Sequence, residues 1–409
     1  MKKRVFITGM GVVSCLGKNK NENLLSLRQG RSGIGIDLER KKHHFKSSLT
    51  GVVCFDGLSE PLPRRVRNAV PYHGLYAIEA IREAIADAGL LPSDVGGRHD
   101  TGLITGNDTC LEAVIEGWEN YRGAVDTKYL GSQTTIRGMN SALSLNIGPY
   151  FGIEGFTLTI SAACASGSQA AGIGTMLIRQ GMQKRMIVGG AQEVNWYAMS
   201  CFDAMRAISQ NEQNPSAACR PFEKNRDGLV PSGGAAFLII EDEKTARDRG
   251  AKIYGEITGY GFSGDGEHPV LPNGRGAKSA MAMAMEDAGL RPGQIDYINA
   301  HATATVEGDK AEAWAINQLF GDGGPYLSST KSMTGHECWM AGASEMVYSS
   351  LMMNEMFLAP NINYDEPDPD LPPLNIVARP MEAEPEHIMS NSFGFGGTNS
   401  TLILSRVRD

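Results

Sequence analysis

The sequence predicts an α/β fold built from two copies of one strand-and-helix unit. Two short segments of the first half return in the second half in the same order. ITGMG at residues 7–11 returns as ITGYG at 257–261, and DAGLLP at 87–92 returns as DAGLRP at 287–292. Each DAGL segment follows an amphipathic helix pattern and precedes a short apolar strand pattern. Because there are only two copies, we interpret them as a domain duplication rather than a repeat array.

This duplication divides the chain into an N-terminal half, residues 1–250, and a C-terminal half, residues 251–409. The two repeated segments lie farther apart in the first half than in the second half. We assign the extra length to an insertion or cap at about residues 28–67.

The composition of the chain excludes several classes of protein. The 409 residues are 42% hydrophobic and 21% charged, which is typical of a folded protein with a large core. The net charge of −8 argues against nucleic-acid or membrane-surface binding. No apolar window reaches the length of a membrane helix, and glycines interrupt the apolar start, so we expect neither a membrane span nor a signal peptide.

The cysteine and histidine patterns indicate a cytoplasmic protein without a metal. The seven cysteines are odd in number and form no C-x-x-C pair, which favours free thiols in a reducing compartment. His301 and His336 lack the H-E-x-x-H spacing of zinc enzymes. The glycine-rich segments lack the complete dinucleotide and P-loop motifs, so no cofactor is predicted.

The stretch at residues 156–190 predicts a nucleophile. It reads as a buried strand at 156–160, a turn of small residues around Cys164, a helix at 170–180 and a second buried strand at 186–190. A cysteine at a helix start faces unpaired N–H groups and the positive end of the helix dipole, and both favour the thiolate. The alternative is that Cys164 is a small buried apolar residue, as most free cysteines are.

The duplication predicts a partner for this turn at residues 326–358. There a short strand, small residues and a helix follow one another again, and the turn carries Lys331 and His336. We therefore expect Cys164 and His336 at equivalent helix starts, facing each other across a pseudo-two-fold axis.

Two further segments complete the candidate site. His301 ends another strand, and Glu312 lies on the helix that follows it. The segment NSFGFGGTN at residues 391–399 is a glycine-rich turn between apolar strands, whose backbone N–H groups can form an anion-binding nest.

With these segments in place, the chain resembles the β-ketoacyl-acyl carrier protein synthases, the type I and II condensing enzymes, and is most similar to the ketoacyl synthase I group. The resemblance runs from about residue 5 to residue 404. It includes FDAM at 202–205, STKSMTGH at 329–336 and GFGG at 394–397. It implies the thiolase fold, a duplicated five-layered α/β/α/β/α structure.

The resemblance also implies a decarboxylative Claisen condensation. Cys164 would carry the acyl group, and the N–H groups of Cys164 and Phe395 would form the oxyanion hole. His301 and His336, as neutral N–H donors, would stabilise the enolate left by malonyl decarboxylation. Lys331 would orient this pair, and Glu312 would position Lys331. The expected substrate-binding residues are of two kinds, those that the resemblance implies and those that replace family residues in the pocket. They are Thr303, Thr305, Phe393, Asn107 and Trp339.

Departures from the family pattern concern the acyl pocket. ECWM at residues 337–340 replaces small and aliphatic residues, and NDTC at 107–110 replaces a glycine- and serine-rich turn. Trp339 either fills space in the core or remodels the cavity wall near the active centre. The second reading predicts a preference for rigid, unsaturated or aryl-bearing chains, as in a specialised aryl polyene or pigment ketosynthase working in a heterodimer.

The expected partners are acyl carrier protein and a second ketosynthase chain. Acyl carrier proteins are acidic, so a local basic patch is needed, and Arg64, Arg65 and Arg67 are the candidates. We expect a homodimer or heterodimer through the edge of the strand at 186–188. A thiolase and a non-catalytic chain-length partner are the rival readings. A thiolase would use another cysteine as base, and a chain-length partner would lack Cys164.

Overall fold

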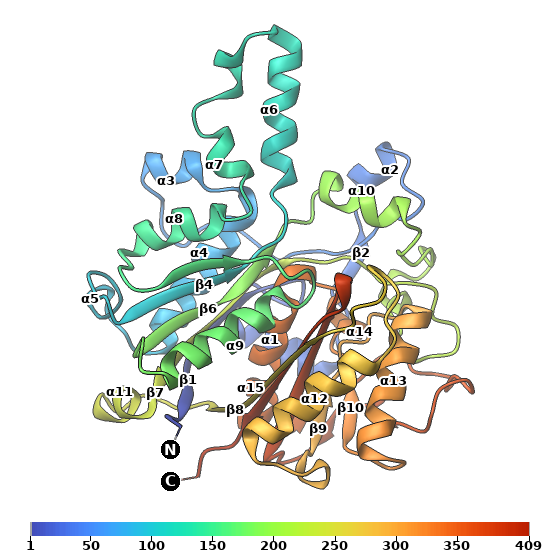
Figure 1. Ribbon diagram of the computed structural model, residues 1–409. Helices are drawn as coiled ribbons and strands as arrows, with labels where there is room; N and C mark the ends of the chain where they lie inside the picture. The colour runs from blue at the N-terminus through green and yellow to red at the C-terminus, as the bar shows by residue number, and fades with distance from the viewer. Residues whose placement is uncertain (1, 409) are drawn as a thin grey trace.

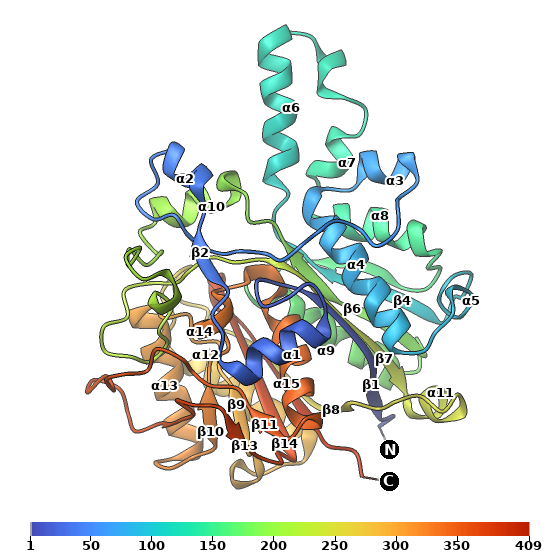
Figure 2. The same cartoon turned by 180° about the vertical axis from the view of Figure 1, so that it is seen from behind.

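The computed structural model describes residues 2–408, which form one eleven-stranded mixed sheet covered by helices (Figures 1 and 2). The strand order is β12-β10-β9-β14-β15-β8-β1-β7-β6-β4-β5. The N-terminal part comprises β1 (Val5–Val13), β7 (Gly234–Asp242), β6 (Arg185–Gln192), β4 (Thr101–Gly106) and β5 (Thr157–Ile160). The C-terminal part comprises β8 (Gly255–Gly264), β15 (Thr398–Ser405), β14 (His387–Gly394), β9 (Tyr297–Asn299), β10 (Tyr326–Ser328) and β12 (Asn375–Ile376).

Helices pack in three layers around the two parts of the sheet. α4 (Tyr72–Asp87) covers β1 and β7, and α12 (Arg275–Ala288) covers β8 and β15. α9 (Ser166–Arg179) and α15 (Ala341–Asn354) pack on each other and contact both parts of the sheet. The resulting order is helix, strand, helix, strand, helix, which confirms the predicted thiolase-type α/β architecture.

The repeated sequence segments make equivalent contacts in the two halves. A side chain on Gly9 would collide with the carbonyl oxygen of Ala84 in α4, and one on Gly259 would collide with that of Ala284 in α12. The carboxylate of Asp87 accepts the N–H of Met10 at 2.9 Å. Asp287 makes the same kind of contact in the second half, where its carboxylate accepts the N–H of Tyr260 at 3.1 Å. The glycines and aspartates recur because each half uses them to seat a helix against a strand.

Two strand predictions are wrong. The segment 156–160 is predicted as a buried strand, but only residues 157–160 form β5, which is the last strand of the sheet, and Leu158 is 40% exposed. β6, which contains residues 186–188, lies between β7 and β4 and is fully buried, so it offers no free edge for a partner. Apolar composition alone cannot separate an interior strand from an edge strand that a second chain covers.

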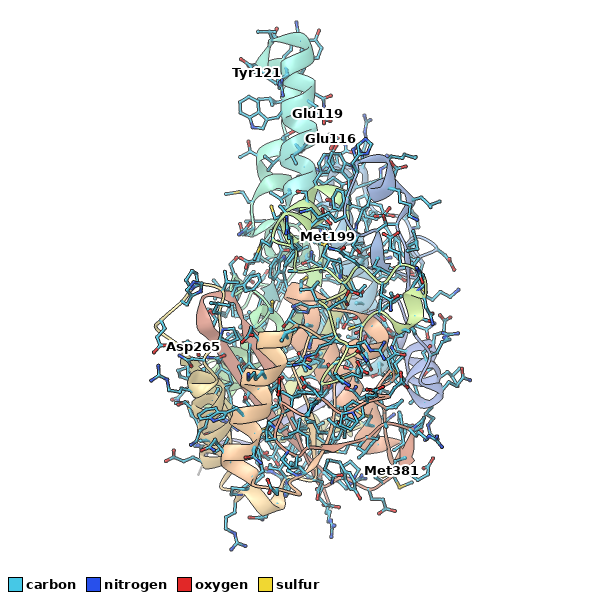
Figure 3. All side chains as sticks on the ribbon, turned by 90° about the vertical axis from the view of Figure 1, so that its right-hand side faces the viewer. Glu116, Glu119, Tyr121, Met199, Asp265 and Met381 are labelled. Atoms are coloured by element: carbon cyan, nitrogen blue, oxygen red, sulfur yellow. The ribbon has the colours of Figure 1, made fainter. Side chains whose placement is uncertain are left out.

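An arm projects from the body of the protein (Figures 1 and 3). It consists of α6 (Leu111–Ala124), a short helix at Thr127–Leu130 and α7 (Thr134–Gly138), and Figure 3 labels Glu116, Glu119 and Tyr121 along it. Trp118 and Val125 expose large apolar side chains on the arm. No pattern in the sequence predicts this arm.

The chain contains further helices and strands. They include α1 (Lys20–Gln29), β2 (Ile34–Ile36), α2 (Leu38–Lys42), β3 (Leu49–Gly51), α3 (Arg64–Ala69), α8 (Ala142–Phe151), α10 (Trp196–Ala204), α13 (Val306–Phe320) and α14 (Lys331–Thr334). Within residues 2–408, no helix has the length and apolar character needed to cross a membrane.

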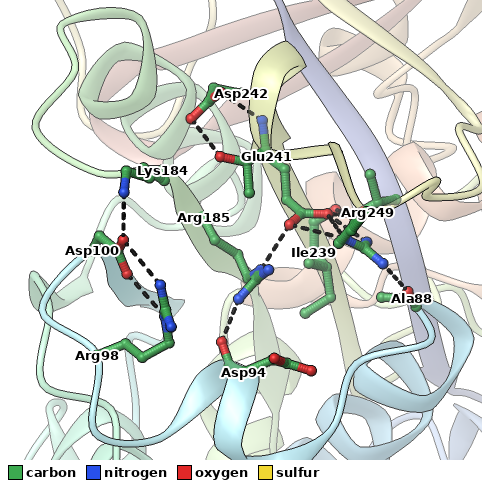
Figure 4. Close-up of polar contacts among 12 residues, drawn as sticks. Ala88, Asp94, Arg98, Asp100, Lys184, Arg185, Ile239, Glu241, Asp242 and Arg249 are labelled. Carbon is green, nitrogen blue, oxygen red and sulfur yellow. Dashed lines mark hydrogen bonds and ion pairs between the residues drawn. The ribbon is translucent and has the colours of Figure 1, made fainter. Parts of the chain in front are cut away.

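A buried ion-pair network ties β6 and β7 to the segment after β7 (Figure 4). The carboxylate of Glu241 is fully buried and accepts from Arg185 at 2.8 Å and from Arg249 at 3.0 Å. It also accepts the hydroxyl of Thr8 in β1 at 2.7 Å. The two guanidinium groups and the hydroxyl satisfy a charge that would be costly to bury alone.

Candidate active site

Cys164 lies where the sequence places it, in the turn between β5 and α9. Ala163 has a positive φ of 48°, and its N–H donates to the carboxylate of Asp108 at 2.9 Å. The N–H of Ala162 donates to the hydroxyl of Ser166 in the first turn of α9, also at 2.9 Å. These bonds hold the turn so that Cys164, only 4% exposed, lies two residues before the start of α9. The predicted order of strand, turn, helix and strand is confirmed, although β5 is not buried and α9 begins at Ser166 rather than at residue 170.

The matching turn of the second half brings His336 to the nucleophile. His336 follows α14, and its Nε2 lies 3.0 Å from Sγ of Cys164. The imidazole of His301, which follows β9, lies edge-on to that of His336 with ring centroids 5.3 Å apart. One ligand-type atom from each of the three residues lies within 4.8 Å of the others. The facing arrangement expected from the duplication is therefore present.

The tautomer of His336 follows from its second hydrogen bond. The N–H of Cys338 donates to Nδ1 at 3.3 Å, so Nδ1 is an acceptor and the hydrogen resides on Nε2. Burial, and then the positive charge of Lys331, lowers the pKa of both His301 and His336 well below its usual value. Both imidazoles are therefore neutral near pH 7, and His336 presents an N–H donor toward Cys164.

This tautomer argues against a metal at the Cys164, His301 and His336 cluster, although their spacing is compatible with one. A metal needs the lone pair of Nε2, but Nε2 of His336 carries the hydrogen. Moving that hydrogen to Nδ1 would set it against the N–H of Cys338. The neighbouring Lys331 adds a repulsive positive charge.

The expectation for Glu312 needs correction. Its carboxylate accepts the backbone N–H of His301 at 3.0 Å and the backbone N–H of Ala302 at 2.7 Å. The side-chain amide of Asn391 also donates to it at 3.0 Å. Lys331 instead forms its ion pair with Glu345, and both side chains are 1% exposed. Glu312 thus holds the His301 loop, and its effect on Lys331 is through charge at a distance.

Glu345 is a site residue that the sequence motifs do not predict. It lies on α15, where residues 341–353 are all buried, and it is the one charged side chain among them. An isolated acid in a buried helix is itself a signal, because such a charge needs a partner. Burial raises the pKa of Glu345 to about 8, and the contact with Lys331 opposes that rise.

The expectation of a resting thiolate is also wrong. Burial raises the pKa of Cys164 to about 12, although Lys331 and the N–H groups of Phe395 and Cys164 act in the opposite direction. The helix start favours the thiolate, whereas loss of solvent around Sγ favours the thiol and has the larger effect. The resting residue is a thiol, and only a small thiolate fraction is present at neutral pH.

We expect the alkylation rate of Cys164 by iodoacetamide to rise about tenfold per pH unit from about pH 7 to about pH 9, because the reactive thiolate increases as pH approaches a raised pKa. The measurement is mass-spectrometric labelling of the Cys164 peptide. Cys54 and Cys201, which are exposed, serve as internal references. A rate that is already constant above pH 7 would contradict the raised pKa.

The glycine turn lies against the nucleophile. The backbone N–H groups of Phe395 and Cys164 both interact with Sγ. A side chain on Gly394 would come within 3.2 Å of the nitrogen of Cys164, and Gly396 has a φ of 77°. Glycine at these two positions allows the turn to approach Cys164 and place its N–H groups there.

A cavity of about 510 Å³ opens onto Cys164. Asp265, labelled in Figure 3, lies at its wall, and the hydroxyls of Thr303 and Thr305 lie 3.0 Å apart there. The predicted site residues that line this cavity are Cys164, His301, Thr303, Thr305, Glu312, His336, Phe393 and Phe395.

Asn107 and Trp339 do not line this cavity. Trp339 is 6% exposed and belongs to an apolar cluster that includes Cys164, Phe202 and Met199, the last of which is labelled in Figure 3. Its indole N–H donates to the hydroxyl of Thr109 at 3.2 Å. Trp339 therefore packs in the apolar surroundings of Cys164, away from the open cavity.

The three arginines proposed for carrier binding lie on α3, beside α7 and α8 in Figures 1 and 2. Arg64, Arg65 and Arg67 are all exposed. They do not line the cavity at Cys164. They present positive charge on a protein whose net charge is −8.

Comparison with known proteins gives consistent matches along the chain. The β-ketoacyl synthase N-terminal domain profile matches residues 2–246, and the C-terminal domain profile matches residues 254–365. The 3-oxoacyl-[acyl-carrier-protein] synthase 1 of Escherichia coli K12 is 39% identical, with all of both chains covered.

Two solved structures are also similar. The ishigamide ketosynthase/chain length factor has a TM-score of 0.92 and 32% identity, with both chains fully covered. The AntDE:AntF complex, a type II PKS acyl-carrier protein with its ketosynthase bound to the hexaketide, has a TM-score of 0.91 and 29% identity, again with both chains fully covered.

Proposed function

Since the chain belongs to the β-ketoacyl synthase family, we propose that it is a β-ketoacyl-acyl carrier protein synthase that condenses an acyl group on Cys164 with malonyl-acyl carrier protein. The observation that carries this proposal is the contact of His336 Nε2 with Cys164 Sγ at 3.0 Å, made by a neutral imidazole whose hydrogen is on Nε2. Such a group is a hydrogen-bond donor, as enolate stabilisation requires.

In the first half-reaction, Cys164 attacks the thioester of the incoming acyl chain. The new bond joins Sγ to the acyl carbon, and the bond to the phosphopantetheine sulfur breaks. The proton of Cys164 is transferred overall to that leaving sulfur, so the exchange consumes no acid or base. The N–H groups of Cys164 and Phe395 stabilise the oxyanion, and each such donor contributes about 3 kcal/mol in comparable sites.

In the second half-reaction, the malonyl C–C bond breaks and carbon dioxide leaves. The electron pair becomes an enolate, whose oxygen accepts hydrogen bonds from His301 and His336. The enolate carbon attacks the Cys164 thioester, the C–S bond breaks, and the β-ketoacyl chain remains on the carrier. Cys164 leaves as a thiolate and takes a proton from solvent. Burial keeps both imidazoles neutral, and the charge of Lys331, which is fixed by Glu345, adds to this effect.

The test uses labelled acyl-acyl carrier protein, followed by malonyl-acyl carrier protein. We expect label on the Cys164 peptide, and its release as a β-ketoacyl product when malonyl carrier is added. Absence of label under conditions where an established synthase is acylated would favour the non-catalytic chain-length reading. Transfer with coenzyme A thioesters alone would favour a thiolase. Against the thiolase, burial raises the pKa of Cys338 well above its usual value, so this residue stays a thiol near neutral pH and has almost no thiolate to take up a proton.

We infer that acyl carrier protein docks at Arg64, Arg65 and Arg67, because an acidic carrier needs a local basic surface on this acidic protein. The reaction needs no further cofactor, since the phosphopantetheine arm delivers both substrates. Seven free cysteines fit a cytoplasmic setting. A specialised aryl polyene or pigment pathway is the second candidate, and Trp339 in the apolar surroundings of Cys164 favours it.

We propose that a second ketosynthase chain, either a copy or a related chain, pairs with the free edge of β5. Thr157 and Leu158 are exposed at this edge, and pairing would satisfy its backbone groups. Light scattering is expected to show a dimer for the wild type and a monomer for Leu158→Arg. Leu25→Arg, at an exposed position of α1, is the matched control. A stable, active wild-type monomer at micromolar concentration would contradict the proposal.

A further inference from the structure

The donor role of His336 depends on the peptide unit between Glu337 and Cys338. The backbone N–H of this unit donates to Nδ1 of His336 at 3.3 Å and keeps the hydrogen of the imidazole on Nε2. The carbonyl of the same unit accepts the N–H of Met340 at 3.2 Å. Cys338 has a φ of 46°, which is unfavourable for a residue with a side chain. A conformation of this kind persists only where neighbouring groups hold it.

The main chain of His336 itself is held by other contacts. Its N–H donates to the carbonyl of Val230 at 2.6 Å, and its carbonyl accepts the N–H of Ser232 at 2.8 Å. These two bonds involve neither the carbonyl of Glu337 nor the N–H of Cys338. The orientation of the peptide that follows Glu337 therefore needs an anchor of its own.

The side chain of Glu337 provides such an anchor on α15. Glu337 is 1% exposed, and Ser344 and Tyr348, which are fully buried, lie one turn apart on the same face of α15. The hydroxyl of Ser344 donates to Oε2 of Glu337, and the hydroxyl of Tyr348 donates to Oε1 at 3.0 Å. Both oxygens of the carboxyl group are therefore bonded to one helix.

The two contacts persist when Glu337 is protonated. Burial raises the pKa of Glu337 to about 7, and the hydroxyls of Ser344 and Tyr348 and the charge of Lys331 oppose that rise. The hydroxyl of Ser344 also lies 2.9 Å from the carbonyl of Ala341. The protonated carboxyl group can therefore donate to Ser344, whose own hydrogen then bonds to Ala341. The side chain is anchored in both states, so its position does not depend on pH.

The contacts of Glu337 favour a positional role over a contribution to stability. Its hydrogen-bond partners are two neutral hydroxyls. Lys331 forms its ion pair with Glu345 and acts on Glu337 through its charge at a distance. Burying an acid against neutral donors costs free energy that an apolar side chain would not cost.

We propose that Glu337 is a positioning residue for malonyl decarboxylation, because its anchored side chain holds the following peptide toward Nδ1 of His336 and so keeps the hydrogen on Nε2. Without this anchor, the peptide can turn away and the hydrogen can move to Nδ1. Nε2 would then present a lone pair to the enolate oxygen, which it would repel instead of stabilise. This proposal rests on the proposed condensing function and adds a residue that does not touch the substrate.

The experiment measures the tautomer and the rate in the same protein, the Cys164→Ala variant with labelled imidazole nitrogens. Nitrogen-15 NMR separates a nitrogen that carries a hydrogen from one that does not, and the His336 signals are assigned by their loss in His336→Gln. Glu337→Met, which keeps the length of the side chain but removes both oxygens, is expected to place the hydrogen on Nδ1 in a measurable fraction. It should lower kcat for carbon dioxide release by about threefold to tenfold, the usual effect of one neutral hydrogen bond, with little change in KM.

Glu337→Gln is the conservative companion variant. Its amide can donate to Ser344 and accept from Tyr348, as protonated Glu337 does, so it should keep both the tautomer and the rate. Ser344→Ala removes one anchor and should shift the tautomer in the same direction as Glu337→Met. Ser350→Ala is the matched control, because Ser350 is also a buried serine of α15 but donates to the carbonyl of Met346 at 2.8 Å. This control should change neither readout.

The outcomes separate the anchor from the proposed function. A hydrogen that stays on Nε2 in Glu337→Met, with an unchanged kcat, would overturn the proposal and leave the condensing function intact. Equal losses in Glu337→Gln and Glu337→Met would also overturn it, since the charge of Glu337 would then matter instead of its contacts. If Glu337→Met fails to fold, Ser344→Ala and its control decide in the same way. Absence of decarboxylation in the parent Cys164→Ala protein would count against the proposed function, and the NMR comparison would still test the anchor.

Discussion

Replacing Cys164 with alanine is expected to abolish condensation, by a factor of about 10⁴ or more, while decarboxylation of malonyl-acyl carrier protein continues. Condensation needs a sulfur that carries the acyl group, and no other thiol lies at the Nε2 of His336 among residues 2–408. Decarboxylation needs only the enolate-stabilising donors, and the hydrogen bond from Cys338 to Nδ1 of His336 does not involve the thiol.

The measurement follows carbon dioxide and the β-ketoacyl product in the same reaction. Cys219→Ala is the matched control, since Cys219 is also a buried free cysteine but packs in a separate cluster with Ile34 and Val230. It should leave both activities near the wild-type values. Loss of decarboxylation in a folded Cys164→Ala protein would show that the division of roles between the thiol and the histidines is wrong.

The duplicated fold could be predicted because its sequence marks are steric. Gly9 and Gly259 recur since each lies against a helix carbonyl, and Asp87 and Asp287 recur since each binds a backbone N–H of the strand beside it. Such contacts tolerate few residue types and therefore leave a readable pattern. The arm formed by α6 and α7 has no counterpart in the repeat, so the pattern did not indicate it.

The candidate site could be predicted where its residues lie at the ends of repeated elements. Cys164 and His336 occupy equivalent turns, and the duplication alone places them face to face. The pairing of Lys331 with Glu345 was missed because it depends on which face of α15 meets α14, and the all-buried helix has no amphipathic pattern to indicate that face.

Two errors have a common physical origin, which is burial that depends on neighbours distant in sequence. The pKa of Cys164 was expected to fall because only its own helix start was considered, and the surrounding cluster raises it instead. The exposed edge of the sheet was placed at residues 186–188 rather than at β5, because the order of strands is set by pairings between remote segments.

In a Cys164→Ala background, His336→Ala is expected to slow malonyl decarboxylation by about 10²- to 10³-fold, the usual effect of removing one donor from a developing oxyanion. The reason is the fixed tautomer. The N–H of Cys338 occupies Nδ1 at 3.3 Å, so Nε2 is a permanent donor aimed at the reacting group. The readout is carbon dioxide release under saturating and limiting malonyl-acyl carrier protein, which separates kcat from KM.

His336→Gln is the informative companion, because the amide nitrogen of glutamine can replace an Nε2–H donor but cannot act as a base. If His336 acts as a donor, His336→Gln should recover a large part of the rate that His336→Ala loses. The rate should also be independent of pH between about 6 and 8, since burial and Lys331 hold the pKa of this imidazole well below its usual value of about 6.5. A rate in the His336→Gln protein as low as in His336→Ala, together with an inflection near pH 6.5 in the parent, would mean that His336 exchanges a proton during the step. The enolate would then be stabilised mainly by His301. The backbone N–H of His301 donates to the carboxylate of Glu312 at 3.0 Å, which fixes the position of this residue.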